Sequence, residues 1–313
     1  MKAAVTGGAG FIGSNLVDKL LEQGHDVIVI DNFSSGKDNN LVQHKNNPHL
    51  TVHRKNINDD LASEFKGVEV VFHLAAIPLV QYSIQHPKET HHNNVTGTLN
   101  VLENARSAGV KRLIFVSSAS IYGDQEKLPF TEDMLPKPMS PYAAHKITGE
   151  YYCKLFYQLY GLETVCLRFF NVYGPRHDPS SSYACLIPRS IARVLRGESI
   201  TIFGDGEQTR DFVYVGDIAD ATIAAAFSTS SSCLGESINI ASGKETSVNE
   251  IAKTILSLHS GKIDYMPPVK EPRRNVADNT KAQKLLGWTP KITLKQGLTL
   301  TFDFFHSKNS SKS

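Results

Sequence analysis

Residues Thr6–Gly13, which read TGGAGFIG, are the most informative part of the sequence for the fold. An apolar run, Lys2–Thr6, leads into it, and a helical pattern of apolar residues follows from Phe11 to Gly24. A second apolar run, Asp26–Ile30, predicts a parallel strand after that helix. Glycines between a strand and a helix let the backbone approach a pyrophosphate, which the free N–H groups of the helix N-terminus then bind. The stretch therefore predicts a dinucleotide-binding unit.

An acidic residue ends the second strand at the position that such a unit needs. Asp31 lies about twenty residues beyond the glycines, where a carboxylate accepts hydrogen bonds from the adenosine ribose and repels a 2′-phosphate. Asn32 follows it, and no arginine stands immediately beside the two. The sequence predicts NAD rather than NADP as the cofactor.

Strands and helices alternate through the first half of the chain. Further strands are predicted at Leu50–His53, Val70–Leu74, Leu113–Ser117 and Glu163–Phe169, and helices near Asp60–Phe65, Lys88–Ala108 and Tyr142–Tyr160. Strands so rich in valine, isoleucine and leucine indicate a parallel sheet that helices cover on both faces. We expect an α/β protein with a Rossmann doubly wound parallel sheet, in which residues 1–170 form the NAD-binding domain.

The pattern changes after Asn171 and predicts a second, smaller domain. Prolines and serines interrupt the alternation, and the later apolar runs are short and mixed: Ser199–Phe203, Phe212–Val215 and Ser237–Ile240. We expect residues 171–313 to form mainly a mixed α/β substrate-binding domain, with some segments returning to the first domain.

Composition excludes several classes of function. The 33 basic and 31 acidic residues leave a net charge of +2, which gives no footprint for nucleic acid or an anionic membrane. No signal peptide or membrane-length segment is recognised, and the four cysteines lack the spacing of a metal site. Adjacent His91 and His92 point to different sides of a helix, so we expect no metal. These features predict a cytoplasmic protein.

A candidate catalytic set lies at the end of the strand predicted at Leu113–Ser117. Tyr142 and Lys146 are four residues apart at the start of a helix, so both project from one face. A neighbouring ammonium favours the phenolate and is expected to lower the tyrosine pKa, which would give a general base near neutral pH. Ser118, in the stretch SSASIYG at 117–123, follows the strand at the edge where open α/β folds bind ligands.

With these motifs the sequence resembles the extended short-chain dehydrogenase/reductase family, and within it the nucleotide-sugar 4-epimerases of the UDP-glucose or UDP-N-acetylglucosamine type. The resemblance covers nearly the whole chain. Its further motifs are HLAA at 73–76, NNVTGT at 93–98, RFFNVYGPR at 168–176, GDGEQTRD at 204–211 and NVAD at 275–278.

The resemblance implies a role for each catalytic residue. Tyr142 would be the base, Lys146 would hold the nicotinamide ribose, and Ser118 would bind the sugar 4-hydroxyl. A hydride would pass from carbon 4 to NAD, and the 4-keto sugar would turn over in the pocket and take the hydride back on its other face. The resemblance also implies a homodimer formed through the helices predicted at Lys88–Ala108 and Tyr142–Tyr160. Apolar positions on these helices, such as Leu155 and Leu159, are by default expected mostly in the core.

The remaining site residues are carried over in the same way. The predicted cofactor-binding residues are Gly7, Gly10, Phe11, Ile12, Gly13, Asp31, Asn32, Asn56, Ile57, Leu74, Ala75, Ala76, Asn93, Ser117, Tyr142, Lys146 and Phe169. The predicted substrate-binding residues are Ser118, Tyr142, Asn171, Ala184, Leu186, Ile187, Arg210, Arg273 and Asn275. Asn56 stands where the family often has an aspartate against adenine.

Related activities are separated by the residues after Ser118. The dehydratases of this superfamily carry Thr-Asp-Glu there, and the nucleotide-sugar decarboxylases tend to carry a glutamate at the position of Ser120, whereas this chain has Ser118-Ala119-Ser120. Elimination or decarboxylation would thus lack its proton carriers. A reductase of 4-keto sugars remains an alternative, and a non-catalytic NAD-binding protein a more distant one.

The substrate is less well defined than the chemistry. Asn275 occupies the gate position at which a bulky tyrosine excludes N-acetyl groups in the family, which favours a pocket that admits N-acetylated sugars as well as plain hexoses. The stretch at 183–188 also resembles the group that accepts them. The usual Arg-Pro-Gly-Asp reads PVKE at 268–271, so the arginine that clamps the nucleotide is missing, and Arg210, Lys270, Arg273 and Arg274 are the candidates to replace it.

Overall fold

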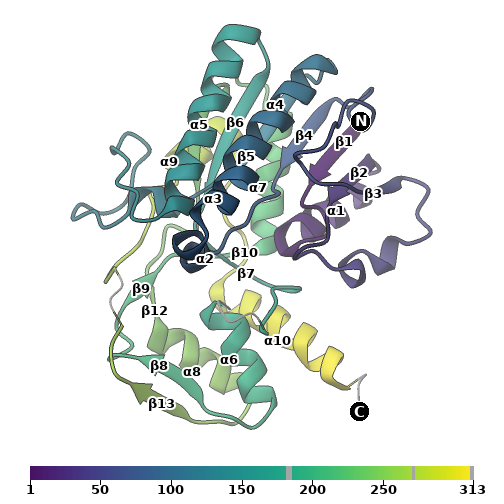
Figure 1. Cartoon of the computed structure of the whole chain (residues 1–313). Helices are drawn as coiled ribbons and strands as arrows, with labels where there is room; N and C mark the ends of the chain where they lie inside the picture. Colours follow the sequence, from purple (N-terminus) through teal and green to yellow (C-terminus); the bar gives the residue numbers. More distant parts are fainter. Residues whose placement is uncertain (181–184, 270–271, 311–313) are drawn as a thin grey trace.

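A parallel sheet forms the larger, upper part of the molecule (Figure 1) in this computed structural model, which describes residues 1–180, 185–269 and 272–310. The sheet has seven strands in the order β11-β6-β5-β4-β1-β2-β3, and every neighbouring pair is parallel. The strands are β1 Lys2–Thr6, β2 Asp26–Asp31, β3 Leu50–Arg54, β4 Val70–His73, β5 Arg112–Ser118, β6 Glu163–Phe169 and β11 Glu236–Ile240. This arrangement confirms the predicted Rossmann fold.

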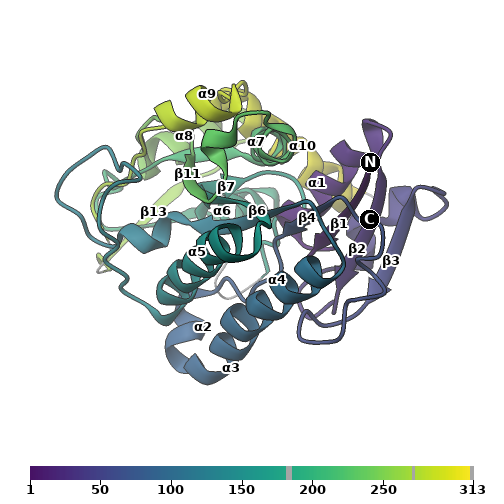
Figure 2. The ribbon, with the colours of Figure 1, turned by 90° about the horizontal axis from the view of Figure 1, so that it is seen from above.

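Helices cover both faces of the sheet, as the apolar strands predicted (Figure 2). α1 (Phe11–Glu22) packs against α7 (Val215–Phe227) on one face, where Leu16, Val17 and Ile218 are fully buried. α4 (Gly97–Ser107) and α5 (Pro141–Tyr160) lie on the other face and bury Leu102, Cys153 and Phe156. Two separate apolar cores therefore hold the sheet between its helical layers.

The helix predicted at Lys88–Ala108 is present but interrupted. It consists of α3 (Pro87–His91), a π-helical turn η3 (His92–Thr96) and α4. Short π-helical turns are frequent at functional sites, and this one carries the predicted cofactor residue Asn93. The short helix α2 (Val80–Gln85) comes just before α3.

The lower part of the molecule has a core of its own (Figure 1). Three helices pack together there: α6 Leu186–Leu195, α8 Val248–Leu258 and α10 Leu294–Ser310. Three short strand pairs accompany them: β7 Asn171–Tyr173 with β10 Phe212–Tyr214, β8 Ile200–Phe203 with β13 Ile263–Met266, and β9 Thr209–Arg210 with β12 Thr246–Ser247. The remaining elements are α9 Thr280–Leu286, η1 Asp38–Asn40, η2 Val42–His44, η4 Ala119–Tyr122 and η5 Ser231–Cys233.

β11 belongs to the main sheet, beside β6, although it lies in the second half of the chain. A division into residues 1–170 and 171–313 stays a prediction. Among the described residues, no helix is long and apolar enough to cross a lipid bilayer.

Two expectations from the sequence were wrong. The helix near Asp60–Phe65 is a series of turns, because the Asp59 and Asp60 carboxylates accept hydrogen bonds from the backbone N–H groups of Asn56 and Ala62 and so compete with helix formation. Leu155 and Leu159 of α5 were expected in the core by default, but they are 44% and 66% exposed. They lie on the side of α5 that faces away from the sheet.

Candidate active site

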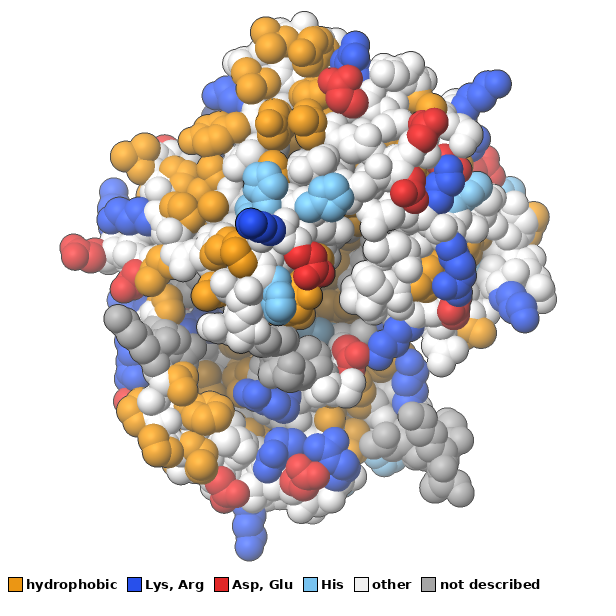
Figure 3. All heavy atoms as spheres, in the orientation of Figure 1, with side chains coloured by type: hydrophobic (Ala, Val, Ile, Leu, Met, Phe, Trp, Pro, Cys, Tyr) orange, Lys and Arg blue, Asp and Glu red, His pale blue; other side chains and the backbone are white. Residues whose placement is uncertain are grey.

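The predicted site residues gather where the strands of the main sheet end. β1, β2, β4 and β5 are parallel, so their carboxyl ends lie at one edge, which faces the lower part of the molecule (Figure 1). The surface is hollowed between the two parts (Figure 3). Open α/β sheets bind their ligands at this edge, next to the point where the strand order reverses. Here that point lies between β1 and β4.

The glycine turn after β1 leaves no room for side chains. Gly7 has φ +73°, and a Cβ atom on it would lie 2.8 Å from the Ala75 nitrogen. A Cβ atom on Gly13, in the first turn of α1, would lie 2.1 Å from the Gly7 carbonyl oxygen. No side chain caps the N-terminus of α1, which starts after Gly10. Its first N–H groups, those of Phe11, Ile12 and Gly13, are thus positioned to bind a pyrophosphate.

Asp31 closes the same turn from the side of β2. Its carboxylate accepts hydrogen bonds from the backbone N–H groups of Ala9 (3.0 Å) and Phe33 (2.8 Å), and burial raises its pKa. Asn32 is exposed beside it, and its side-chain oxygen accepts from the Ser34 N–H. The glycine cradle and this carboxylate together fit the diphosphate and ribose of NAD.

The predicted adenine side contains a residue that the sequence analysis missed. Asn56 Oδ1 accepts hydrogen bonds from the backbone N–H (2.9 Å) and side-chain amide (3.0 Å) of Asn58. The buried Ile57 packs under Gly97. Asn58 Oδ1 is buried and has no hydrogen-bond partner among the described residues, so it is available to accept a bond from a ligand amine. Its place two residues beyond Asn56 was the signal in the sequence.

A buried histidine holds the loop that follows β4. His73 Nδ1 lies 2.7 Å from Thr6 Oγ1, and Nε2 lies 2.9 Å from Thr98 Oγ1. The Thr98 hydroxyl donates to the Asn94 carbonyl oxygen, so Nε2 carries the proton and Nδ1 accepts from Thr6. Burial lowers the His73 pKa to about 3, and the nearby Lys146 charge adds to this effect.

Asn94, which the sequence analysis did not select, shapes the cofactor side of this loop. Its amide accepts from the Ile77 N–H at 2.8 Å and donates to the Ile77 carbonyl oxygen at 3.0 Å, while Asn93 donates to Asn94 Oδ1. The predicted residues Leu74, Ala75 and Ala76 lie in the loop, half-buried opposite the glycine turn. The π-helical turn η3 thereby places Asn94 inward and Asn93 beside it.

The three predicted catalytic residues meet at the end of β5. The Ser118 hydroxyl lies beside the Tyr142 phenol, close enough to lower its pKa. Lys146 Nζ donates to the Val116 carbonyl oxygen at 2.7 Å and lies 5.9 Å from the centre of the Tyr142 ring. Ser140 caps α5 through the Ala143 N–H, and Pro141 is its first residue, so the helix starts where it presents Tyr142 to β5.

The expected lowering of the Tyr142 pKa is not what this structure shows. Burial raises the pKa of Tyr142 to about 12, and the hydrogen bond from Ser118 offsets only part of this effect. Burial also lowers the pKa of Lys146 to about 8. The expectation was wrong because the spacing of residues on a helix shows which side chains lie on one face, but not how deeply they are buried. Tyr142 and Lys146 are both almost fully buried, so desolvation has the largest effect on their pKa values.

Two predicted cofactor residues have side chains that are used within the protein. The Ser117 hydroxyl donates to Glu150 Oε1 at 2.5 Å, and Phe169 is buried in the core on the α1 face of the sheet. On the substrate side, Leu186 and Ile187 lie in the first turn of α6, and Ala184 is outside the described residues.

Basic residues on the substrate side are mostly paired. Arg273 makes a bidentate ion pair with Asp205, at 2.8 Å for both bonds, and Arg274 pairs with Glu245. Arg210 Nη1 donates to the Thr209 carbonyl oxygen. Lys270 lies outside the described residues.

Asp211, a buried residue missed by the sequence analysis, organises the backbone on this side. Its carboxylate accepts from the N–H groups of Ser242, Gly243 and Ala277. Its carbonyl oxygen accepts from the backbone and side chain of Asn171. Asn275 Oδ1, two residues before Ala277, is buried with no hydrogen-bond partner in the described part of the chain, and so is Ser120 Oγ. Both polar atoms are available to a ligand.

The fold, the glycine cradle with Asp31, and the Ser118, Tyr142 and Lys146 set define a Rossmann-fold protein of the NAD-dependent dehydrogenase and epimerase type. Residues 3–241 match the NAD dependent epimerase/dehydratase family. The chain belongs to this family, and NAD is its cofactor.

Similar proteins span the whole chain. UDP-glucose 4-epimerase of Mycolicibacterium smegmatis is 39% identical over 99% of this chain and 100% of its own length. The structure of UDP-glucose 4-epimerase of Thermotoga maritima with UDP-glucose covers 99% of this chain and 100% of that chain, with 40% identity and a TM-score of 0.92. UDP-N-acetylglucosamine 4-epimerase of Methanobrevibacter ruminantium, with UDP-N-acetylmuramic acid, matches at 37% identity, 98% coverage of both chains and a TM-score of 0.94. UDP-glucuronic acid decarboxylases are also among the relatives.

Proposed function

We propose that this protein interconverts the 4-epimers of a UDP-hexose through a transient 4-keto sugar. The observation that carries the proposal is that Ser118, Tyr142 and Lys146 meet at the end of β5, where the Ser118 hydroxyl lowers the Tyr142 pKa and Lys146 donates to the Val116 carbonyl oxygen. A hydroxyl and a phenol in contact can bind one sugar hydroxyl between them and move its proton. NAD, when bound, supplies the acceptor for the hydride from carbon 4 and a positive ring that favours the phenolate.

The chain's own residues would bind, orient and deprotonate the sugar. Ser118 would accept or donate a hydrogen bond at the 4-hydroxyl, and Tyr142 would take its proton and later return it. Lys146, fixed on the Val116 carbonyl oxygen, would hold the nicotinamide ribose and place its positive charge near the phenolate. Desolvation raises the Tyr142 pKa to about 12, so a positive charge beside the phenol would be needed to form the base near neutral pH.

The lack of a carboxylate side chain at the two residues after Ser118 favours epimerisation over decarboxylation or dehydration. The position at which the decarboxylases tend to carry a glutamate holds Ser120, whose buried hydroxyl cannot act as a carboxylate base or acid. Dehydration would need two acidic residues there. A nucleotide 4-keto-sugar reductase remains the second candidate, because a serine, tyrosine and lysine set also suffices to reduce a carbonyl.

The substrate pocket is proposed to take N-acetylated hexoses as well as plain ones. Asn275, at the gate position, is smaller than tyrosine, and its unpartnered Oδ1 atom could accept a hydrogen bond from a substituent on the sugar. Similar proteins include epimerases named for both kinds of sugar. From the resemblance, we propose that Arg210, in β9, helps to bind the nucleotide.

We further propose a homodimer formed through α5 and α4. Hydrophobic side chains gather over these helices (Figure 3), among them Tyr151, Leu155, Leu159 and Tyr160 of α5. An exposed apolar patch of this kind marks an interaction surface. The cytoplasmic location is proposed from the sequence features alone.

A panel of UDP-sugars tests the proposed function. The purified protein would be incubated, with NAD but no other reactant, with UDP-glucose, UDP-galactose, UDP-N-acetylglucosamine and UDP-glucuronate, and the products resolved by anion exchange and proton NMR. We expect conversion of each accepted sugar into its 4-epimer, with no net change in NAD. Formation of carbon dioxide and a UDP-pentose from UDP-glucuronate would instead establish a decarboxylase. Conversion only of 4-keto sugars, supplied with reduced cofactor in a separate incubation, would establish a reductase.

A further inference from the structure

Three side chains of α5 reach the last three residues of β5. Tyr142 contacts Ser118, Lys146 donates to the Val116 carbonyl oxygen, and Glu150 accepts from the Ser117 hydroxyl at 2.5 Å. Tyr142, Lys146 and Glu150 are spaced four residues apart along α5, so they share one face of the helix. The first two contacts belong to the proposed chemistry, whereas the third joins a buried carboxylate to the residue immediately before Ser118.

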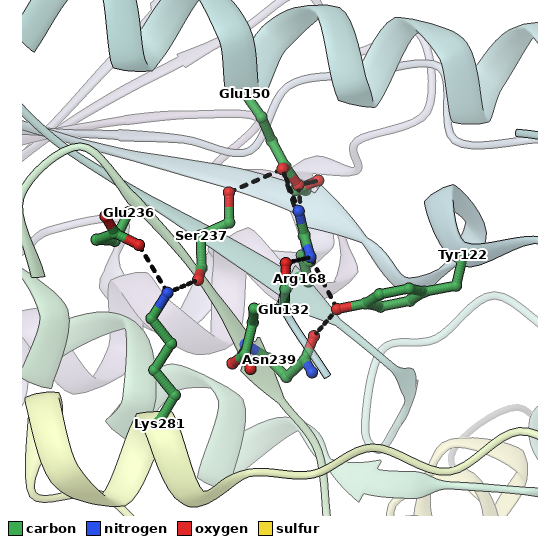
Figure 4. A network of polar contacts seen from close by, with 9 residues as sticks. Tyr122, Glu132, Glu150, Arg168, Glu236, Ser237, Asn239 and Lys281 are labelled. Atoms are coloured by element: carbon green, nitrogen blue, oxygen red, sulfur yellow. Dashed lines mark hydrogen bonds and ion pairs between the residues drawn. The ribbon is translucent and has the colours of Figure 1, made fainter. Parts of the chain in front are cut away.

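Glu150 is itself held from the opposite side (Figure 4). Arg168 of β6 donates through Nε to Oε1 at 3.0 Å and through Nη2 to Oε2 at 2.8 Å. Ser237 of β11 donates to Oε2 at 2.7 Å. Glu150 and Arg168 are both buried. Because both carboxylate oxygens of Glu150 accept hydrogen bonds from these partners, the orientation of the carboxylate is fixed. The Ser117 hydroxyl therefore donates to an acceptor that is held in place.

The same arginine holds the far end of the turn that carries the catalytic serine. Arg168 Nη1 donates to the Tyr122 hydroxyl oxygen at 2.8 Å, and the Tyr122 hydroxyl donates to Asn239 Oδ1 at 2.6 Å (Figure 4). Tyr122 ends η4, which begins directly after Ser118. One buried ion pair therefore fixes the residues on both sides of Ser118, Ser117 through Glu150 and Tyr122 through Arg168.

We propose that Glu150 and Arg168 are positioning residues for Ser118: they fix the Ser118 hydroxyl relative to the face of α5 that carries Tyr142 and Lys146. Neither residue touches the reacting atoms. The inference rests on the proposed function in so far as Ser118 acts on the sugar hydroxyl. A displacement of a catalytic group by a fraction of an ångström lowers the rate of the chemical step more than it lowers binding.

Two serine variants separate positioning from stability. Ser117→Ala and Ser237→Ala each remove one serine hydroxyl that donates to the same Glu150 carboxylate, but only Ser117 adjoins the catalytic serine. We expect Ser117→Ala to lower kcat for the preferred UDP-sugar about tenfold, with KM changed less than about twofold, and Ser237→Ala to leave kcat within about twofold of the parent. Both should lower the thermal midpoint similarly and retain NAD.

A second readout does not depend on turnover. Amide hydrogen exchange of the peptide that contains residues 118–122 should quicken in Ser117→Ala and not in Ser237→Ala, with or without NAD. Equal kcat values for the two variants, or equal exchange, would overturn the inference while leaving the proposed function intact. If the parent protein converts no UDP-sugar but exchange differs as expected, the proposed function fails and the positioning of Ser118 stands.

Discussion

Burial, and not sequence spacing, controls the titration of the catalytic side chains. Tyr142 and Lys146 are four residues apart on α5, a spacing that can be seen in the sequence. Their pKa values move in opposite directions, to about 12 and about 8, because desolvation disfavours the charged form of each. Residue identity therefore predicts which groups meet, whereas their protonation depends on the packing around them.

Replacing Tyr142, the proposed base, tests the role of its phenol oxygen. Tyr142→Phe removes the phenol oxygen and keeps the ring, so we expect turnover to fall by roughly a hundredfold or more while NAD stays bound. Turnover would be followed by product NMR, and NAD content by releasing the cofactor from the denatured protein. Ser118→Ala should give a smaller loss of turnover. Substantial epimerisation by Tyr142→Phe would refute the assignment of the base.

His73 should make the folded protein sensitive to acid. Burial lowers its pKa to about 3, whereas the same histidine in the unfolded chain has a pKa of about 6.5. Between these two pH values the unfolded chain binds a proton that the folded protein does not bind. The free energy of unfolding therefore falls as the pH drops from about 6.5 towards 3. His145 and His177, whose pKa values burial lowers to about 4, add to the effect.

The matching experiment replaces His73 by a side chain that cannot titrate. In His73→Gln the slope of unfolding free energy against pH, measured by urea denaturation between pH 6.5 and 4.5, should decrease by up to about 1.4 kcal/mol per pH unit. His92→Gln, at an exposed position, is the control. An unchanged slope in His73→Gln would show that His73 is protonated in the folded state.

Among the elements, the main-sheet strands and the long helix α5 were predicted well, whereas the helix α7 and the shortest strands were not. β6 has the predicted bounds, and α5 differs from its prediction by one residue. α7 went unrecognised because it is apolar on nearly all sides, packed between α1 and the sheet, and so shows no periodicity. β9 and β12 have two residues each, too few for a pattern.

For the site, the sequence located the proposed ligand-binding residues more readily than the residues that hold them in place. Gly7, Asp31, Ser118 and Tyr142 stand in motifs at fixed distances along the chain, so a motif locates them. Glu150 acts through contacts between segments far apart in sequence. Such contacts follow from the packed structure and leave no local pattern.

The turn between β1 and α1 should be intolerant of a single methyl group. A Cβ atom on Gly13 would lie 2.1 Å from the Gly7 carbonyl oxygen, so Gly13→Ala must displace the cradle, and we expect NAD affinity to fall at least about tenfold. Gly24→Ala, just after the C-terminal end of α1, is the matched control. A Cβ atom there has no other atom within 4 Å, so the only cost is the backbone strain of an alanine at φ +76°. Both variants should lose stability, but calorimetric titration should show weaker NAD binding for Gly13→Ala alone.

At the scale of the whole molecule, the site lies between two separately packed parts. The sheet with its helices has one core on each face, and α6, α8 and α10 surround a third. The cofactor residues come from the first part and most predicted substrate residues from the second, with the hollow between them (Figure 3). In the proposed function, the sheet edge would present the catalytic side chains, and the smaller part would supply the sugar and nucleotide contacts.

The proposed dimer can be broken by one charge on α5. Leu159→Glu changes a side chain that is 66% exposed, which a partner subunit would cover, so we expect analytical ultracentrifugation to find monomers at concentrations where the parent is a dimer. Val42→Glu alters a side chain that is 59% exposed on η2, which contacts α1 on the opposite face of the sheet from α5, and should remain dimeric. A monomeric parent protein, or a dimeric Leu159→Glu variant, would contradict an interface on α5.

The most direct test of the whole account follows the hydrogen on carbon 4 of the sugar. UDP-glucose deuterated at carbon 4 would be incubated with the protein in ordinary water, and the UDP-galactose formed would be examined by NMR. Transient oxidation, with return of the same hydrogen, predicts that the deuterium stays on carbon 4 of the product. Formation of UDP-galactose without deuterium would show a route through proton exchange with water, and no UDP-galactose at all would contradict the assignment of UDP-glucose as a substrate.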